Sequence, residues 1–302
     1  MKIFITLLAT IFAAMLPCKS SGAEITKTNA ATSEATVRTD RISCSSLIQS
    51  KQSTETAFKA MADIGYKWVD LSCLKWAPHV SVEKLLEDFD AEASRVEALL
   101  AANGLRVSNL TFDPVEARAF EQYEREFTAL AQLAARLDAR LINLMAPSLK
   151  SDRDEQVARL RQLQAIAAKH GILLTVETHC FQITERPADA LQLCRDVPGL
   201  GLTLDPAHYY AGTNQGASFD ALLPLTQGTG FRAGGMTWKE IQLPWGEGPI
   251  DFVKIVKNLE AVGYRGFYVC EYIERHNEVN AVEQARRFFD WAVRLSIKPM
   301  AQ

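Results

Sequence analysis

The chain has 302 residues, with 33 lysines and arginines against 36 aspartates and glutamates, so its formal net charge at pH 7 is −3. It contains no long run of basic residues, and this charge balance argues against a nucleic-acid partner. About 260 residues follow the first 40, which is enough for one large domain or two small ones.

The amino terminus has the pattern of a secretory signal peptide over residues 1–23. A positively charged start precedes an apolar stretch at residues 3–16 and a small-residue cleavage site at residues 21–23. The apolar stretch is too short to remain as a bilayer anchor. We therefore predict an exported protein, periplasmic or secreted, that begins near Glu24 and has no integral membrane segment after cleavage. The alternative is lipidation of Cys18, which the preceding proline fits poorly.

Residues 24–40 are rich in threonine, alanine and serine and lack a hydrophobic period, which predicts a flexible tether. The predicted folded domain therefore covers residues 41–302. Five cysteines follow the signal peptide, an odd number that cannot all pair within one exported chain. No Cys-x-x-Cys pair occurs, so a thiolate zinc site is not expected.

From Arg41 onward, short apolar runs alternate with helical patterns. The expected strands are 42–45, 68–72, 106–111, 141–145, 173–178, 201–205, a weak one at 229–232, and 267–271. The main helical patterns between and after them lie at 82–102, 120–137, 154–169, 252–262 and 282–295. Eight right-handed βα units in about 260 residues predict a single (β/α)8 TIM barrel. An open, doubly wound sheet is the alternative, but no glycine-rich phosphate loop follows the first strand.

Three of the expected strands end on a carboxylate: Glu177, Asp205 and Glu271. A carboxylate where a buried apolar run meets its loop is costly to desolvate unless it is paired, protonated or bound to a cation. In a barrel, the carboxyl ends of the strands meet at one mouth, where active sites lie. With His208 three residues after Asp205, these carboxylates predict an oxygen-rich divalent metal site at that mouth.

Four segments around these residues share a recognisable pattern. They are Thr-Val-Glu-Thr-His at 175–179, Leu-Asp-Pro-Ala-His at 204–208, Trp-Gly-Glu-Gly-Pro-Ile-Asp-Phe at 245–252, and Gly-Tyr-Arg-Gly-Phe-Tyr-Val-Cys-Glu at 263–271. Together they resemble the xylose-isomerase-like barrels of the sugar phosphate isomerase/epimerase family. The resemblance extends over roughly residues 53–295 and implies a carbohydrate as the small-molecule partner.

The resemblance also implies roles for individual residues. Glu177 and Glu271 would bind a divalent metal, Mn²⁺ or Mg²⁺, and act as the acid/base carboxylates, with Asp205 as a further metal ligand. His208 would hydrogen-bond a substrate hydroxyl, and Arg232 would hold a substrate oxygen. A metal polarises a sugar carbonyl, and two carboxylates can remove and return the proton beside it. The expected function is therefore that of an exported sugar isomerase or epimerase, or a related keto-sugar lyase.

The seventh strand departs from the family pattern. It usually supplies a histidine metal ligand, but alignment on Arg232 places Gly228 there, and no histidine lies between His208 and His276. Gln227 or His276 are the candidates to replace it. The alternative function is therefore a metal-depleted, non-catalytic carbohydrate-binding barrel.

Other residues near expected strand ends have only their position as evidence. His79, after the second expected strand, is a candidate substrate contact at the mouth. Aromatic side chains that would stack on a sugar, or else pack in the core, are Trp76, Phe181, Tyr209 and Trp245. The sequence leaves the oligomeric state open, including a homo-oligomer.

Overall fold

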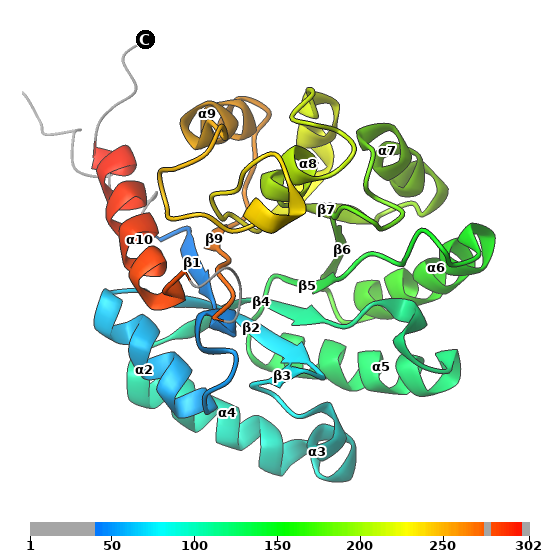
Figure 1. Cartoon of the computed structure of the whole chain (residues 1–302). Helices are drawn as coiled ribbons and strands as arrows, with labels where there is room; N and C mark the ends of the chain where they lie inside the picture. The colour runs from blue at the N-terminus through cyan, green and yellow to red at the C-terminus, as the bar shows by residue number, and fades with distance from the viewer. Residues whose placement is uncertain (1–39, 275–278, 298–302) are drawn as a thin grey trace, which may run out of the picture.

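The computed structural model describes residues 40–274 and 279–297, and Figure 1 shows the helices arranged around a nearly closed barrel of parallel strands. The strands are β1 (Ile42–Ser45), β2 (Trp68–Leu74), β3 (Ala77–Pro78), β4 (Arg106–Phe112), β5 (Leu141–Leu144), β6 (Leu173–Glu177), β7 (Gly201–Leu204), β8 (Thr226–Thr229) and β9 (Tyr268–Cys270). Their order is β8-β7-β6-β5-β4-β2-β1-β9, and short β3 pairs antiparallel with β2. The fold is the predicted TIM barrel.

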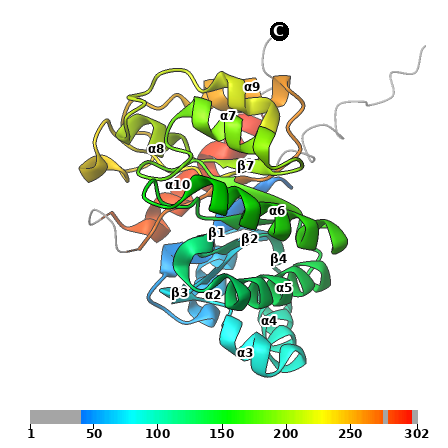
Figure 2. The same cartoon turned by 90° about the vertical axis from the view of Figure 1, so that its right-hand side faces the viewer.

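The helices cover the outside of the strands, as the side view in Figure 2 also shows. They are α2 (Thr54–Ile64), α3 (Val82–Glu87), α4 (Phe89–Asn103), α5 (Phe120–Arg136), α6 (Arg153–Lys169), α7 (Pro187–Asp196), α8 (Pro206–Ala211), α9 (Phe252–Ala261) and α10 (Ala281–Ile297). Short 3₁₀ turns lie at Ser46–Gln49, Val115–Ala117, Asp220–Leu225 and Trp238–Glu240. The last helix, α10, packs beside the first, α2, so the two ends of the barrel chain meet. No helix among the described residues is long and apolar enough to cross a membrane.

The barrel closes between β8 and β9 by a short stretch of pairing. Phe231 forms an isolated parallel bridge with Cys270, and its amide donates to Val269 O at 2.7 Å. The amide of Glu271 in turn donates to Phe231 O at 2.9 Å. This closure fixes Glu271 beside the segment that follows β8.

The seventh parallel strand lies earlier than predicted. We expected a weak strand at 229–232, whereas β8 spans Thr226–Thr229 and pairs with β7 through Thr203 and Gly228. The reason is its composition: Thr-Gln-Gly-Thr contains no apolar run, so hydrophobic periodicity gives no signal there. Of residues 229–232, only Thr229 belongs to β8, although Phe231 forms the bridge to Cys270.

The predicted helix at 82–102 is two helices in the structure. The chain leaves helical geometry at Asp88, whose φ is −151°, and its side chain accepts from the amide of Ala91 at 3.0 Å. Asp88 is therefore the N-cap of α4, a role in which aspartate is favoured. The predicted signal peptide, 1–23, and all of the predicted tether except Asp40 lie outside the described residues.

The interior of the barrel is partly polar. The hydroxyls of Ser43 and Ser108 are 2.7 Å apart, and those of Thr175 and Thr203 are 2.8 Å apart. All four side chains are buried, and each pair satisfies hydrogen-bonding groups that would otherwise be costly in the core. The residues at the carboxyl ends of the strands lie on top of this polar layer.

Candidate functional site

The polar cluster at the carboxyl ends of the strands is built by β6, β7 and the segment after β8. Glu177 is the last residue of β6, and Asp205 follows β7 as the N-cap of α8, accepting from the amide of Ala207 at 2.8 Å. His208 lies one turn later in α8, and Arg232 follows the bridge to β9. Parallel strands bring these ends to one mouth, as the sequence predicted.

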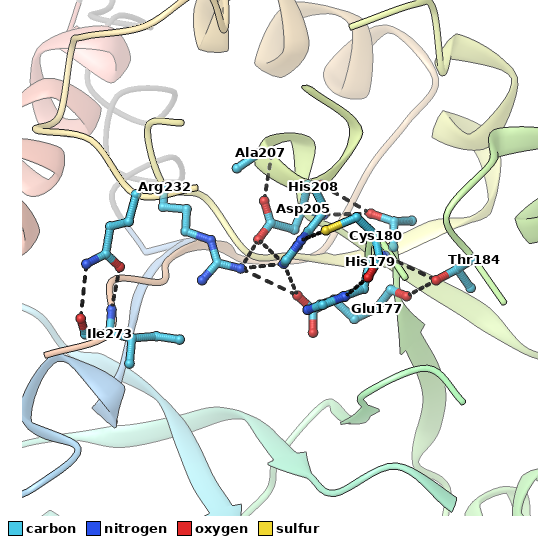
Figure 3. Close-up of polar contacts among 11 residues, drawn as sticks. Glu177, His179, Cys180, Thr184, Asp205, Ala207, His208, Arg232 and Ile273 are labelled. Carbon is cyan, nitrogen blue, oxygen red and sulfur yellow. Dashed lines mark hydrogen bonds and ion pairs between the residues drawn. The ribbon is translucent and has the colours of Figure 1, made fainter. Parts of the chain in front are cut away.

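Arg232 reaches the other three side chains of this cluster from one side, as Figure 3 shows. Its Nη2 is 2.5 Å from Asp205 Oδ2, 2.7 Å from His208 Nε2 and 3.8 Å from Glu177 Oε1. His208 Nε2 is 3.4 Å from Glu177 Oε1 and 3.5 Å from Asp205 Oδ2. A guanidinium only donates, so Nε2 of His208 is the acceptor, and a neutral ring then carries its proton on Nδ1, 3.1 Å from Cys180 Sγ.

The cluster is buried and has more acidic than basic groups. The exposed fractions are 0% for Asp205, 4% for Glu177 and 4% for Arg232. Burial raises the pKa of Asp205, against the pull of the Arg232 guanidinium. Burial and the nearby Glu177 carboxylate raise the pKa of Glu271 well above its usual value. One guanidinium therefore does not neutralise the three carboxyl groups, and a further proton or cation would be favoured there.

Glu271 stands at the edge of the cluster. It follows β9 and is half-buried, and its Oε2 lies over Gly230. Within the part of the chain that the structure describes, the candidate metal ligands that lie within 4.8 Å of one another here are Glu177, Asp205 and His208. The predicted ligand set of Glu177, Asp205 and Glu271 is thus only partly assembled: His208, expected to bind substrate, takes the third place.

The donor set fits a divalent cation. Two carboxylates and an imidazole face one point, and Oε1 of Glu177 is buried without a hydrogen-bond partner among the described residues. Oxygen-rich sites of this kind suit Mg²⁺ or Mn²⁺. The Arg232 guanidinium, however, contacts the same three side chains. A cation and Arg232 would therefore compete for the same ligand atoms.

The position next to the carboxylates is Gly230, not Gly228. A Cβ built on Gly228 would lie 2.8 Å from Thr203 Oγ1 and 3.3 Å from Leu141 Cδ2, within the polar layer below the site. A Cβ on Gly230 would lie 2.0 Å from Glu271 Oε2 and 3.8 Å from Asp205 Cβ. Of the two glycines, Gly230 is therefore the one from which a side chain would reach the carboxylates, whereas the alignment on Arg232 pointed to Gly228.

The substitute ligands considered from sequence do not join the cluster. Gln227 Oε1 accepts from Arg140 Nη2 at 3.0 Å, and Arg140 also donates to Arg265 O in the loop before β9, at the opposite end of the barrel from the carboxylates. His276 lies outside the described residues.

His79 is buried away from the carboxylates. Its exposed fraction is 2%, its carbonyl accepts from Thr54 and Arg95, and burial lowers its pKa. Its ring nitrogens have no hydrogen-bond partner among the described residues. Its contacts are with α2 and α4, so the geometry gives no support to the predicted substrate contact.

Two further residues lie beside the cluster: His179, which its place two residues after Glu177 suggested as a supporting residue, and Cys180, which the sequence did not assign to the site. His179 stacks on His208 with ring centroids 3.6 Å apart, and burial together with His208 lowers its pKa to about 3. Cys180 contacts His208 as described above, and burial raises the pKa of its thiol to about 12. Cys180 comes three residues after Glu177, and its thiol was expected to be a small buried hydrophobic group.

A fourth acidic residue, Asp70, lies in the barrel interior. It belongs to β2, and its Oδ1 accepts from Thr111 Oγ1 at 2.9 Å. Burial raises its pKa to about 7. The sequence signal was an aspartate within the otherwise apolar run Trp-Val-Asp-Leu, which we did not use.

The four aromatic candidates separate into exposed and packed side chains. Phe181 is 54% exposed and Trp76 is 37% exposed, whereas Tyr209 is buried. Trp245 is partly buried against the core and packs on Phe252 with centroids 4.6 Å apart. An additional exposed tryptophan, Trp238, stacks on His208 with centroids 6.0 Å apart.

Comparison with known proteins agrees with the barrel fold. No curated protein sequence matches the chain. Solved structures that share its fold include a xylose isomerase-like TIM barrel protein from Mycobacterium smegmatis in complex with magnesium (TM-score 0.72, 16% identity, 85% of this chain and 96% of that one). They also include D-allulose 3-epimerase from Methylomonas sp. (TM-score 0.65, 16% identity, 84% and 97%) and 3-keto-D-glucoside 4-epimerase from E. coli (TM-score 0.63, 16% identity, 83% and 98%). The profile of one family, described as xylose isomerase-like TIM barrel, matches residues 58–291. With this match over most of its length and the strand-end carboxylates of its barrel, the chain belongs to the xylose isomerase-like TIM barrel family.

Proposed function

We propose that this protein is an exported sugar isomerase or epimerase, or a related keto-sugar lyase, that moves a proton on the carbon beside a carbonyl. The observation that carries the proposal is the buried convergence of Glu177, Asp205, His208 and Arg232 at the mouth, with Glu271 at its edge. Buried groups of this kind cost stability, so their collection in one place indicates a site.

The two glutamates approach the mouth from different strands. Strands β7 and β8 separate β6, which holds Glu177, from β9, which precedes Glu271. A substrate over Asp205 and Arg232 would thus have one carboxyl group on each side. We assign Glu177 as the base that takes the proton from carbon, leaving the electron pair on the enediolate oxygen. Glu271, whose pKa is raised, returns a proton to the opposite face and completes an epimerisation. In the lyase variant, the enediolate instead expels a leaving group from the next carbon.

Arg232 supplies the hydrogen bonds to the substrate oxygens, and His208, whose Nε2 accepts from Arg232, holds the guanidinium in place. Arg232 can donate to a carbonyl or enediolate oxygen from its place between the carboxylates, and its own Nε is buried without a partner among the described residues. A divalent cation, Mn²⁺ or Mg²⁺, would be held by Glu177, Asp205 and His208, with Glu271 nearby. When bound, it would polarise the carbonyl and stabilise negative charge on its oxygen.

The related folds support a ketone-bearing carbohydrate as substrate. Two of the solved structures named above are epimerases whose names specify D-allulose and a 3-keto-D-glucoside. Both ligands carry a keto group, which acidifies the neighbouring carbon–hydrogen bond. A keto sugar is therefore the first class of compound to test.

Deuterium exchange tests the proposal directly. The mature protein, loaded with Mn²⁺ or Mg²⁺, would be incubated in D₂O with a panel of keto sugars, and exchange at carbon would be followed by NMR. We expect exchange in the wild type and its loss in Glu177→Gln and Glu271→Gln. Glu283→Gln, on the exposed surface of α10, is the matched control and should exchange normally. Absence of exchange on every sugar in the metal-loaded wild type contradicts the proposal.

A second candidate function rests on Arg232. Its guanidinium already contacts the three side chains that would hold a metal, and Gly230 lacks the imidazole that the family usually supplies. Both features fit a metal-depleted barrel that binds carbohydrate without catalysis. Sugar binding by calorimetry, with no exchange and no measurable Mn²⁺ affinity, would favour this alternative.

A further inference from the structure

Exposed apolar side chains gather on the loops at the mouth of the barrel. Of the large hydrophobic side chains exposed in the described part of the chain, five lie on loops that follow strands: Trp76, Leu149, Phe181, Met236 and Trp238. Four of these belong to the loops after β5, β6 and β8. Single exposed apolar side chains are normal, but a group of them on one surface indicates a binding site.

Phe181 and Trp238 form an aromatic corner within this group. Their ring centroids are 5.4 Å apart and their planes cross at 70°, and their exposed fractions are 54% and 43%. On its other side, Trp238 lies nearly parallel to His208, with an interplanar angle of 27°. The corner is therefore continuous with the buried polar cluster, through a ring that hydrogen-bonds Arg232.

The backbone holds Phe181 in a strained conformation that keeps its ring exposed. Its φ is +67°, in the left-handed region that bulky residues rarely adopt. The carbonyl of Phe181 accepts from the amide of Leu149 at 3.3 Å, and the amide of Ile183 donates to Pro147 O at 2.8 Å. An exposed ring in a strained residue adds little to folding, and such outliers concentrate at functional sites.

We propose that Phe181 and Trp238 form a subsite for a second ring attached to the reacting sugar, so that the substrate is a glycoside or disaccharide and not a free monosaccharide. This rests on the proposed function, because it places the reacting sugar at the polar cluster. The carbon–hydrogen faces of a pyranose are apolar and stack on aromatic rings, and two rings set at an angle contact a face and an edge together. The reacting ring would lie inward of Trp238, beside His208, and the second ring would rest outside it against Phe181.

Binding of sugars that cannot react tests the subsite without requiring catalysis. Calorimetric titrations of the mature protein would compare glucose with cellobiose, maltose and trehalose. We expect at least one disaccharide to bind roughly tenfold more tightly than glucose, the equivalent of about 1.4 kcal/mol. Equal affinity for glucose and all three disaccharides would overturn the proposal.

Variants then locate the effect. Phe181→Asn removes the ring and keeps a residue that tolerates positive φ, and Trp238→Ala removes the other wall. Each should cancel the disaccharide advantage, and Phe181→Asn, which leaves the contact of Trp238 with His208 in place, should leave glucose affinity unchanged. Leu86→Ala, an exposed apolar residue on α3 that is 49% exposed, is the control and should change neither. An undiminished disaccharide advantage in both aromatic variants overturns the proposal.

The same variants separate this inference from the proposed function and from self-association. If the aromatic variants lose a disaccharide advantage that the wild type has, while the wild type exchanges no deuterium, the subsite is supported and the proposed catalysis is rejected. If the wild type exchanges deuterium on free keto sugars but has no disaccharide advantage, the catalysis is supported and the subsite is rejected. If light scattering shows a wild-type dimer that Trp238→Ala converts to monomer, the corner is an interface between copies and the subsite is rejected.

Discussion

At the scale of single residues, the charge balance of the site depends on one guanidinium, that of Arg232, among several carboxylates. Arg232 contacts Asp205 and His208 directly and lies near Glu177, so it is the resident positive charge of the cluster. Buried carboxylates without a cation are costly, and Arg232 removes part of that cost. Any metal ion that binds must displace Arg232 from these contacts or share them with it. The affinity for the metal ion therefore measures how strongly Arg232 competes.

Replacing Arg232 should strengthen metal binding. In Arg232→Gln, the competing positive charge is gone and the carboxylates are left to the metal, so Mn²⁺ affinity should rise by roughly tenfold or more by calorimetry. The melting temperature without metal should fall, and added Mn²⁺ should raise it more than in the wild type. Arg140→Gln, which removes a half-buried arginine bonded at the other end of the barrel, is the control. An unchanged affinity in Arg232→Gln would mean that the guanidinium does not compete.

A histidine should strengthen metal binding when it replaces Gly230 but not when it replaces Gly228. Gly230→His places its ring beside Glu271 and Asp205, provided the flexible Glu271 side chain turns aside, and should tighten Mn²⁺ and Zn²⁺ binding. Gly228→His pushes its Cβ against Thr203 and should lower the melting temperature without tightening metal binding. Calorimetry and thermal unfolding of both variants measure this. Tighter binding in Gly228→His, with no gain in Gly230→His, would show that the original alignment was correct.

Asp70 should make stability fall as pH rises. Its pKa is about 7 in the folded protein and near 3.8 when unfolded, so the folded state retains a proton that the unfolded state loses. Between about pH 4 and pH 7 the free energy of unfolding therefore decreases with rising pH. Asp70→Asn should remove this contribution, on the order of 3 to 4 kcal/mol at pH 8 and little at pH 4. Urea unfolding of both proteins from pH 4 to pH 8 measures it, and parallel curves would contradict the assignment.

At the scale of elements, the site depends on how β6 and β7 are held together where they end. Thr178 Oγ1 accepts from the amide of Asp205 at 2.9 Å and lies 3.3 Å from the carbonyl oxygen of Asp205. One buried hydroxyl thus serves both backbone groups of a residue whose side chain belongs to the site. Glu177 precedes this threonine, so the same contact fixes the two carboxylates relative to each other.

Removing that hydroxyl should loosen the site and the fold together. Thr178→Val keeps the shape and leaves the amide of Asp205 buried without a partner, which costs about 1 to 3 kcal/mol of stability. Thr178→Ser keeps the hydroxyl and is the matched control. Chemical unfolding and Mn²⁺ titration should both show a loss in the valine variant only. A valine variant as stable as the serine variant would mean that the contact is replaced, for example by water.

At the scale of the whole molecule, the sequence predicts a signal peptide and a tether before the described barrel. The barrel occupies residues 41 to 274 and 279 to 297, and all five of its cysteines are buried as free thiols. The preceding residues carry the predicted signal and tether. We propose that the protein is exported and periplasmic or secreted, as the signal pattern predicts.

Export should leave a defined new amino terminus. Expressed in a bacterium with its complete sequence, the mature protein should begin near Glu24, because residues 21–23 are the small-residue site after the apolar stretch. Intact-mass measurement of the purified protein checks this. Replacement of Ala23 by a bulky residue is the control and should block or shift cleavage. An intact Met1, or a mass that includes lipid on Cys18, would refute the predicted cleavage.

The sequence by itself determined the barrel and most of the site's composition. Seven of the eight parallel strands were legible because buried parallel strands are continuous apolar runs, and Glu177, Asp205 and Glu271 stood out because a carboxylate interrupts each run at its end. β8 was misplaced because Thr-Gln-Gly-Thr is polar, so it carries no hydrophobic signal. The alignment on Arg232 pointed to Gly228 as the histidine position, whereas Gly230 is the glycine beside the carboxylates.

Only the tertiary structure decided which side chains share a point in space. Arg232 is 27 residues from Asp205 and 55 from Glu177 in the chain, and no local pattern places its guanidinium between them. The same holds for Trp238 on His208 and for Asp70 beneath the site. It also holds for His79, whose position at a strand end suggested the mouth but which is buried, with its carbonyl oxygen bonded to α2 and α4. Strand ends follow from local periodicity, whereas side-chain convergence depends on barrel closure and loop path, which are set by packing between segments distant in sequence.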